Sequence, residues 1–217
     1  MSERVAPAGA PPPKQPLEIQ GPAGRIEALL EDPGGAPGRF GVVCHPHPQF
    51  GGTMHNKVVH ILARALHELG IPTLRFNYRG VGSSAGGYDE GRGETDDAHA
   101  VIEWGRRHWP SAGLVLAGFS FGARVALRAA VPARAARLIT VAPPVTRIEE
   151  PVPHPGCPWL IVQGDADELI DCRAVRDWAA GFQPPPDLKV LAGCDHFFHG
   201  RLLDLKESVQ ERLRAWG

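Results

Sequence analysis

The stretch Gly118-Phe119-Ser120-Phe121-Gly122 sets a serine between two glycines, where an apolar run meets an alanine-rich run. The apolar run, residues 114–117, predicts a strand, and residues 123–130 predict a helix. This spacing is typical of a sharp strand-to-helix turn that strains the serine backbone and lifts its hydroxyl above the sheet. Both glycines are needed because a side chain there would collide with the neighbouring strand or helix. The alternative is a glycine-rich loop that only turns the chain, so the remaining sequence must supply further chemistry.

Composition points to one ordinary globular domain. The chain has 217 residues, of which 43% are hydrophobic and 22% are charged, and these are globular values. A net charge of −1 gives no electrostatic reason to expect nucleic acid or an anionic membrane as a partner. No apolar run approaches the ~18 residues needed to span a bilayer.

The first residues differ in composition from the rest. Residues 1–16 are rich in proline and alanine, so we expect a flexible tail there and a single domain over 17–217. The tail lacks the apolar core of a signal peptide. The four cysteines are scattered without Cys-x-x-Cys spacing, which argues against both a zinc site and a disulfide framework. Together these features predict a cytoplasmic protein; they do not indicate its oligomeric state.

Apolar runs alternate with amphipathic stretches along the domain. The strands predicted besides 114–117 are a hairpin of 17–20 with 25–30, then 39–44, 72–76, 137–141, 159–163 and 188–191. The predicted helices are 55–69, 95–108, 122–131, 171–181 and 198–216. This alternation predicts an α/β fold with a mostly parallel twisted sheet and helices on both faces. The proline-rich stretch between 141 and 159 is too short for a cap domain, which predicts an open site.

A serine hydroxyl needs a general base to become nucleophilic, and that base needs an orienting acid. Acid candidates lie directly after the 159–163 strand: Asp165, Asp167, Glu168 and Asp171. We favour Asp167, because Asp165 is expected to bond local backbone amides of the turn and Asp171 fits a helix N-cap. The competing interpretation for all four is a solvated acidic loop.

The base candidate follows the last predicted strand. His196 lies where a loop can bring it over Ser120, whereas its competitor, His199, is expected at the start of the final helix. The order serine, acid, base along the chain is one in which such triads occur. The competing interpretation of His196 is an exposed loop histidine.

An oxyanion site needs two backbone N–H groups aimed at the developing negative charge. Phe121, directly after the serine and at a helix N-terminus, is one predicted donor. The other is expected in the loop after the 39–44 strand, where prolines 46 and 48 have no N–H. His47 is therefore predicted as the second donor, with Gln49 as the alternative.

The same loop also contains a possible metal-ligand pair. His45 and His47 have the spacing of such a pair, and a third ligand would have to come from His55 or a nearby carboxylate. Because the triad and its oxyanion site account for the loop without an ion, we predict no metal and no cofactor.

These segments together resemble a known family. They are residues 45–54 with Asn56 and Lys57, then 76–84, 118–122, 163–167 and 195–196. The chain is similar to compact α/β-hydrolases, particularly small bacterial hydrolases that share a core with dienelactone hydrolases and prolyl-oligopeptidase-like catalytic domains. The resemblance spans about residues 39–200 and maps the family's triad onto Ser120, Asp167 and His196. One departure is Pro46, where the wider superfamily commonly has glycine after the histidine.

Four further residues are candidates for lining the substrate entrance. Phe50, Tyr78 and Arg79 are expected near the site, and Phe197 could form an apolar wall beside the base. For Arg79, a structural ion pair is the interpretation that we favour over a place at the entrance. The glycine-rich loop 77–82 could cradle a phosphate, but the resemblance implies a loop at the rim of the active site.

The sequence therefore predicts a serine hydrolase that cleaves small carboxylic esters or thioesters through an acyl-enzyme. A peptidase or amidase is the nearest alternative, because the same triad attacks amides. A catalytically silent α/β-hydrolase fold used as a binding protein is the alternative from another class.

Overall fold

The structure is a computed structural model that describes residues 14–148 and 151–217. Most of the predicted tail, residues 1–13, lies outside the described residues. The first strand of the described residues, β1, spans Lys14–Gly21, so residues 14–16, which were predicted as tail, belong to a strand. Lys14 pairs with Glu31 and Pro16 with Leu29 across the hairpin, and this register accounts for the earlier start.

In the part of the chain that the structure describes, the core of the fold is an eight-stranded sheet with the order β1-β2-β4-β3-β5-β6-β7-β8. After β1 come β2 (Gly24–Glu31), β3 (Arg39–Cys44), β4 (Thr73–Phe76), β5 (Gly113–Phe119), β6 (Arg137–Val141), β7 (Trp159–Gly164) and β8 (Asp187–Leu191). The β1–β2 and β2–β4 pairs are antiparallel, and all others are parallel. The predicted mostly parallel α/β sheet is confirmed.

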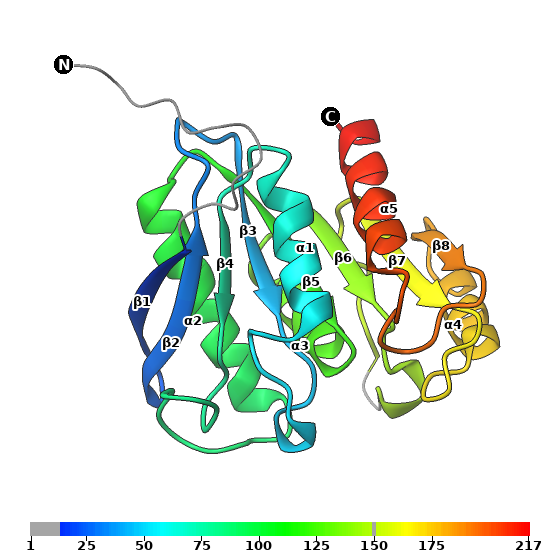
Figure 1. Cartoon of the computed structure of the whole chain (residues 1–217), viewed down its shortest axis with the longest axis horizontal. Helices are drawn as coiled ribbons and strands as arrows, with labels where there is room; N and C mark the ends of the chain where they lie inside the picture. The colour runs from blue at the N-terminus through cyan, green and yellow to red at the C-terminus, as the bar shows by residue number, and fades with distance from the viewer. Residues whose placement is uncertain (1–13, 149–150) are drawn as a thin grey trace.

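The described residues form five α-helices, which cover both faces of this sheet (Figure 1). They are α1 (Lys57–His67), α2 (Arg92–His108), α3 (Phe121–Ala130), α4 (Cys172–Ala180) and α5 (Leu202–Ala215). Apolar side chains of α1 and α5 share one buried cluster, and those of α2, α3 and α4 share the other. The central strands contribute side chains to both clusters. Because both of their faces are buried, their sequences are continuous apolar runs.

Two helix starts, those of α2 and α5, differ from the prediction by three or more residues. Helix α2 begins at Arg92, before the predicted residue 95, because the Glu94 carboxylate accepts the backbone N–H of Gly91 at 2.7 Å and caps the helix there. Helix α5 begins at Leu202 instead of residue 198, because the buried Phe198 has φ of 55°. That left-handed conformation cannot belong to a right-handed helix.

The carboxyl ends of the parallel strands meet at one edge of the sheet, where α/β proteins place their sites. Residues 142–158 connect β6 to β7, and in the described part of this segment the only helix is a 3₁₀ turn, η2 (Val145–Arg147). The edge is therefore not covered by a domain inserted at this point. Among the described residues, no helix is long and apolar enough to cross a membrane.

Candidate active site

Ser120 lies at the tip of the turn from β5 to α3 in a strained conformation. Its φ is 54° and its ψ is −120°, which is rare for a residue with a side chain. A Cβ at Gly118 would lie 2.1 Å from the carbonyl oxygen of Gly122. A Cβ at Gly122 would lie 2.3 Å from the carbonyl oxygen of Cys44. The requirement for both glycines is thus confirmed, because backbone from α3 and β3 occupies the space.

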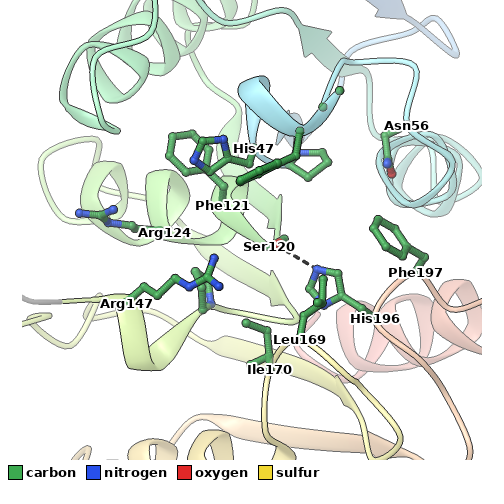
Figure 2. A pocket seen from close by; sticks show the side chains of 15 residues that line it. His47, Asn56, Ser120, Phe121, Arg124, Arg147, Leu169, Ile170, His196 and Phe197 are labelled. Atoms are coloured by element: carbon green, nitrogen blue, oxygen red, sulfur yellow. Dashed lines mark hydrogen bonds between the residues drawn. The ribbon is translucent and has the colours of Figure 1, made fainter.

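Ser120, His196 and Asp167 come together at the carboxyl-end edge of the sheet. Nε2 of His196 lies 3.1 Å from Oγ of Ser120 (Figure 2), and its Nδ1 lies 2.8 Å from Oδ2 of Asp167. A carboxylate only accepts hydrogen bonds, so Nδ1–H donates to Asp167. Nε2 then carries the lone pair that accepts the serine hydroxyl proton. This is the tautomer that a general base requires.

Asp167 is held as a carboxylate by its surroundings. Burial raises its pKa, but hydrogen bonds from His196 and from the backbone N–H groups of Ile170 and Leu169 outweigh burial and leave the pKa below its ordinary value. The amide of Gln163 donates a further bond of 2.9 Å to Oδ2. The charge and the orientation of this side chain are both maintained.

The other carboxylates of this loop have different partners. Asp165 accepts the N–H of Gly193 at 2.6 Å, so it ties two loops together instead of bonding local amides as predicted. Glu168 accepts the backbone N–H of His196 at 3.2 Å, and Asp171 caps α4 as expected. Two of these carboxylates thereby position the loop that carries the histidine.

His199 is not part of this arrangement. Its Nδ1 lies 2.7 Å from Oδ2 of Asp195, and 70% of its side chain is exposed. His196, by contrast, is buried. The structure therefore brings the first of the two candidate histidines to Ser120 and leaves the second at the surface.

The predicted oxyanion donors both line the space in front of Ser120. Among the described residues, the backbone N–H groups of Phe121 and His47 have no hydrogen-bond acceptor. The N–H of Gln49 donates to Nδ1 of His47 at 3.3 Å, which disfavours this alternative donor. Phe121 is also the first residue of α3, where the helix dipole attracts negative charge.

His45 links the loop that carries His47, a predicted oxyanion donor, to the loop that follows β4. Its Nδ1–H donates to the carbonyl of Pro46 at 2.7 Å, and its Nε2 accepts the backbone N–H of Tyr78 at 3.2 Å. Burial lowers the pKa of His45 to about 3, so the ring is neutral. With both nitrogens engaged, it offers no lone pair to a metal. Among the residues that the structure describes, no group of three potential ligands could hold a metal ion.

A pocket of about 350 Å³ opens at Ser120 and His196. Phe50, which is 82% exposed, and Phe197, which is 40% exposed, lie on its rim as predicted. The lining also includes residues that were not predicted: Asn56, Arg124, Arg147, Leu169 and Ile170. Arg124 follows Ser120 by one helical turn, a spacing that could have revealed it. Arg147 and Leu169 come from distant segments, and only the fold brings them here.

Tyr78 and Arg79 do not line the pocket, which corrects that prediction, and Arg79 instead has the structural ion pair that we favoured for it. The ring of Tyr78 is fully buried and packs edge-on against Phe76 and Phe121. Arg79 donates from Nη2 to Oδ1 of Asp97 at 2.8 Å and from Nε to Oδ2 at 3.0 Å. Asp97 is therefore a buried partner of Arg79.

Comparison with known sequences finds a matching family model and a relative that is similar over most of its length. Residues 45–214 match the family model described as "Alpha/beta hydrolase domain". A Rickettsia prowazekii protein, "Uncharacterized protein RP471", is 33% identical over 91% of this chain and 87% of its own length.

Solved structures are similar over nearly the whole chain. XC6422 from Xanthomonas campestris, described as "a member of a/b serine hydrolase without lid", is 43% identical with a TM-score of 0.90. That match covers 99% of this chain and 98% of the other. An alpha-beta serine hydrolase homologue from Coxiella burnetii is 45% identical with a TM-score of 0.87, covering 92% and 97%.

Proposed function

The chain belongs to the α/β-hydrolase family, and from that premise we propose that it is a serine hydrolase of small carboxylic esters or thioesters. The observation that carries the proposal is the continuous hydrogen-bonded series Ser120–His196–Asp167 beside an open pocket. The two backbone N–H groups without an acceptor in the described structure, at Phe121 and His47, support it. Neither a metal nor a cofactor is required by this chemistry.

In the first half-reaction, Nε2 of His196 removes the proton from Ser120 as Oγ attacks the carbonyl carbon. The N–H groups of Phe121 and His47 stabilise the negative charge that develops on the carbonyl oxygen. Asp167 stabilises the imidazolium that forms. The tetrahedral intermediate then collapses, and Nε2 returns its proton to the departing alcohol or thiol.

In the second half-reaction, water enters where the leaving group was. His196 removes one proton from that water, and the resulting hydroxide attacks the acyl-enzyme carbonyl. Collapse of this second intermediate returns the proton to Oγ of Ser120 and releases the carboxylic acid. The short β6–β7 connection and the open pocket favour small or exposed substrates over long lipids buried beneath a cap.

Labelling with a fluorophosphonate probe tests the nucleophile. We expect the wild-type protein to be labelled at Ser120 and Ser120→Ala to remain unlabelled while giving the same circular dichroism spectrum. Equal labelling of the two proteins, or a folded wild type that does not react, would show that the proposal is wrong. Absence of reaction would favour a non-catalytic binding protein.

Matched substrates then separate the two enzymatic alternatives. p-Nitrophenyl esters and p-nitroanilides with the same acyl group release related chromophores, so their kcat/KM values are directly comparable. We expect a strong preference for the ester. A preference for the anilide would instead identify a peptidase or amidase.

A further inference from the structure

The pocket at Ser120 has an uneven distribution of charge. Arg124 of α3 and Arg147 of η2 are its only lining arginines, and no aspartate, glutamate or lysine lines it within the described residues. Figure 2 shows both arginines on the side of Ser120 away from His196 and Phe197. One end of the pocket is therefore cationic, and the other is formed by the histidine and apolar side chains.

Within residues 14–148 and 151–217, neither arginine has a counter-ion. In the described parts of the chain, no ion pair or hydrogen bond involves the guanidinium of Arg124 or Arg147, and Nε of Arg124 is buried without a partner. Arg124 is partly buried and Arg147 is exposed, whereas two more deeply buried arginines are paired with carboxylates: Arg75 with Glu31 and Arg79 with Asp97. Among the described residues, the two guanidinium groups of the pocket thus lack the carboxylate partners that Arg75 and Arg79 have.

The positive field of the two arginines reaches the reaction centre. Burial lowers the pKa of His47, and Arg147 and Arg124 lower it further against the opposing effect of Glu94. An anion bound at the arginines would satisfy the unpartnered donors. The planar guanidinium fork suits a carboxylate, which it can contact through two parallel hydrogen bonds.

The position of the leaving group decides which part of the substrate would carry this anion. His196 protonates the leaving group, so the leaving group must lie on the His196 side of Ser120. The acyl chain then extends toward the opposite side, where the arginines lie. A carboxylate contacting Arg124 and Arg147 would therefore be carried by the acyl chain.

We propose that Arg124 and Arg147 form a carboxylate subsite and that the preferred substrates are monoesters or monothioesters of dicarboxylic acids. This inference rests on the proposed function, because it names the substrate class of the same site. Hydrolysis at Ser120 would release the alcohol or thiol and the free dicarboxylic acid. The arginines select the substrate and take no part in bond breaking.

A pair of substrates that differ in one charge tests the subsite. p-Nitrophenyl hydrogen adipate carries a free carboxylate, and p-nitrophenyl methyl adipate has the same chain with that group esterified. We expect wild-type kcat/KM to favour the charged ester by about tenfold or more, as hydrogen bonds to a charged group allow. The preference should fall with added salt, because the pocket is open to solvent.

Variants identify the residues responsible. Arg124→Gln and Arg147→Gln should each lower the ratio of charged to neutral kcat/KM several-fold, mainly through KM, and Arg147→Lys should retain part of it. Arg176→Gln removes an exposed arginine of α4 outside the pocket and should retain the wild-type ratio. Fluorophosphonate labelling of each variant checks that it is folded.

The outcomes separate failure of the subsite from failure of the proposed function. If wild type hydrolyses both adipates with equal kcat/KM and the arginine variants do not change the ratio, the subsite is wrong and the esterase activity stands. If wild type hydrolyses neither ester and is not labelled, both proposals are wrong. A preference for 4-carboxyphenyl hexanoate over its methyl ester would overturn the assignment of the anion to the acyl chain.

Discussion

At the scale of single residues, the orientation of His196 depends on Asp167, whose two carboxylate oxygens both accept hydrogen bonds. Oδ1 of Asp167 accepts the N–H groups of Leu169 and Ile170, at 2.9 and 2.8 Å. Its Oδ2 accepts His196 and Gln163, at 2.8 and 2.9 Å. With both oxygens engaged, the carboxylate cannot rotate without losing bonds, and the imidazole is held in one tautomer.

Asp167→Asn should lower kcat by roughly 10³–10⁴-fold with little change in KM, because an amide cannot hold the required tautomer. Steady-state hydrolysis of a p-nitrophenyl ester measures this change. Asp171→Asn is the matched control, because asparagine also caps a helix; its kcat should stay near wild type. A larger loss in the control than in Asp167→Asn would mean that the acid has been misassigned.

Gly118→Ala tests the close packing around Ser120. The added methyl group would overlap backbone of α3 and not a movable side chain, so we expect a loss of about 3 kcal/mol in the free energy of unfolding. Thermal denaturation should show a Tm lower by roughly 10 °C for a chain of this size. Gly38→Ala, where a Cβ would meet no atom within 4 Å, should leave Tm nearly unchanged. Similar shifts in the two variants would contradict the packing argument.

At the scale of secondary-structure elements, ion pairs and side-chain bonds fix the loops that follow the strands. The side chain of Asp97, on α2, accepts the backbone N–H of Arg79 at 2.9 Å as well as its guanidinium. The loop after β4 is thus attached to α2. This attachment explains why Arg79 is a structural residue and does not reach the substrate pocket.

Asp97→Ala should cost about 3 kcal/mol of unfolding free energy, because it leaves a largely buried guanidinium without its partner. Urea denaturation measures the loss, and KM for the ester should not change. Glu103→Ala removes the partner of Arg106 in an exposed pair on the same helix and should cost less than about 1 kcal/mol. An increase in KM with no loss of stability would instead favour the predicted role of Arg79 at the substrate.

At the scale of the whole molecule, acid should unfold this protein partly through a single buried histidine. The pKa of His45 is about 3 in the folded state because burial disfavours its charged form, whereas an unfolded histidine has a pKa of about 6.5. Between these values the unfolded chain binds more protons than the folded one. Stability contributed by this group is therefore complete above pH 6.5 and is lost as the pH falls toward 3.

The unfolding free energy of the wild type should fall by about 1.4 kcal/mol for each pH unit below 6.5 through His45 alone. His45→Asn and His45→Gln lack the titrating group and should be less stable at pH 7 but show a shallower pH dependence. Urea denaturation at pH 7, 6 and 5 gives the slopes. Equal slopes in wild type and both variants would contradict the contribution of His45.

Most of the architecture was predictable because its signals are local. The apolar runs that became β3 and β6 have the predicted bounds, since strands buried on both faces need continuous apolar sequence. The starts of α2 and α5 were not predictable from periodicity, because a capping carboxylate and a left-handed Phe198 determine them. The side chains of Ser120, Asp167 and His196 could be selected in advance, since each follows a strand that must end at the same edge.

The sequence by itself determined the α/β fold, the strained serine turn and the order of the residues that meet at Ser120, because these depend on local pattern and on the geometry of parallel strands. Only the tertiary structure decided which remaining side chains reach the pocket. Arg79 pairs with a carboxylate on a helix eighteen positions away, whereas Arg147 reaches the pocket from the β6–β7 connection. Such outcomes depend on distances between segments that are remote in the chain, and no local pattern specifies those distances.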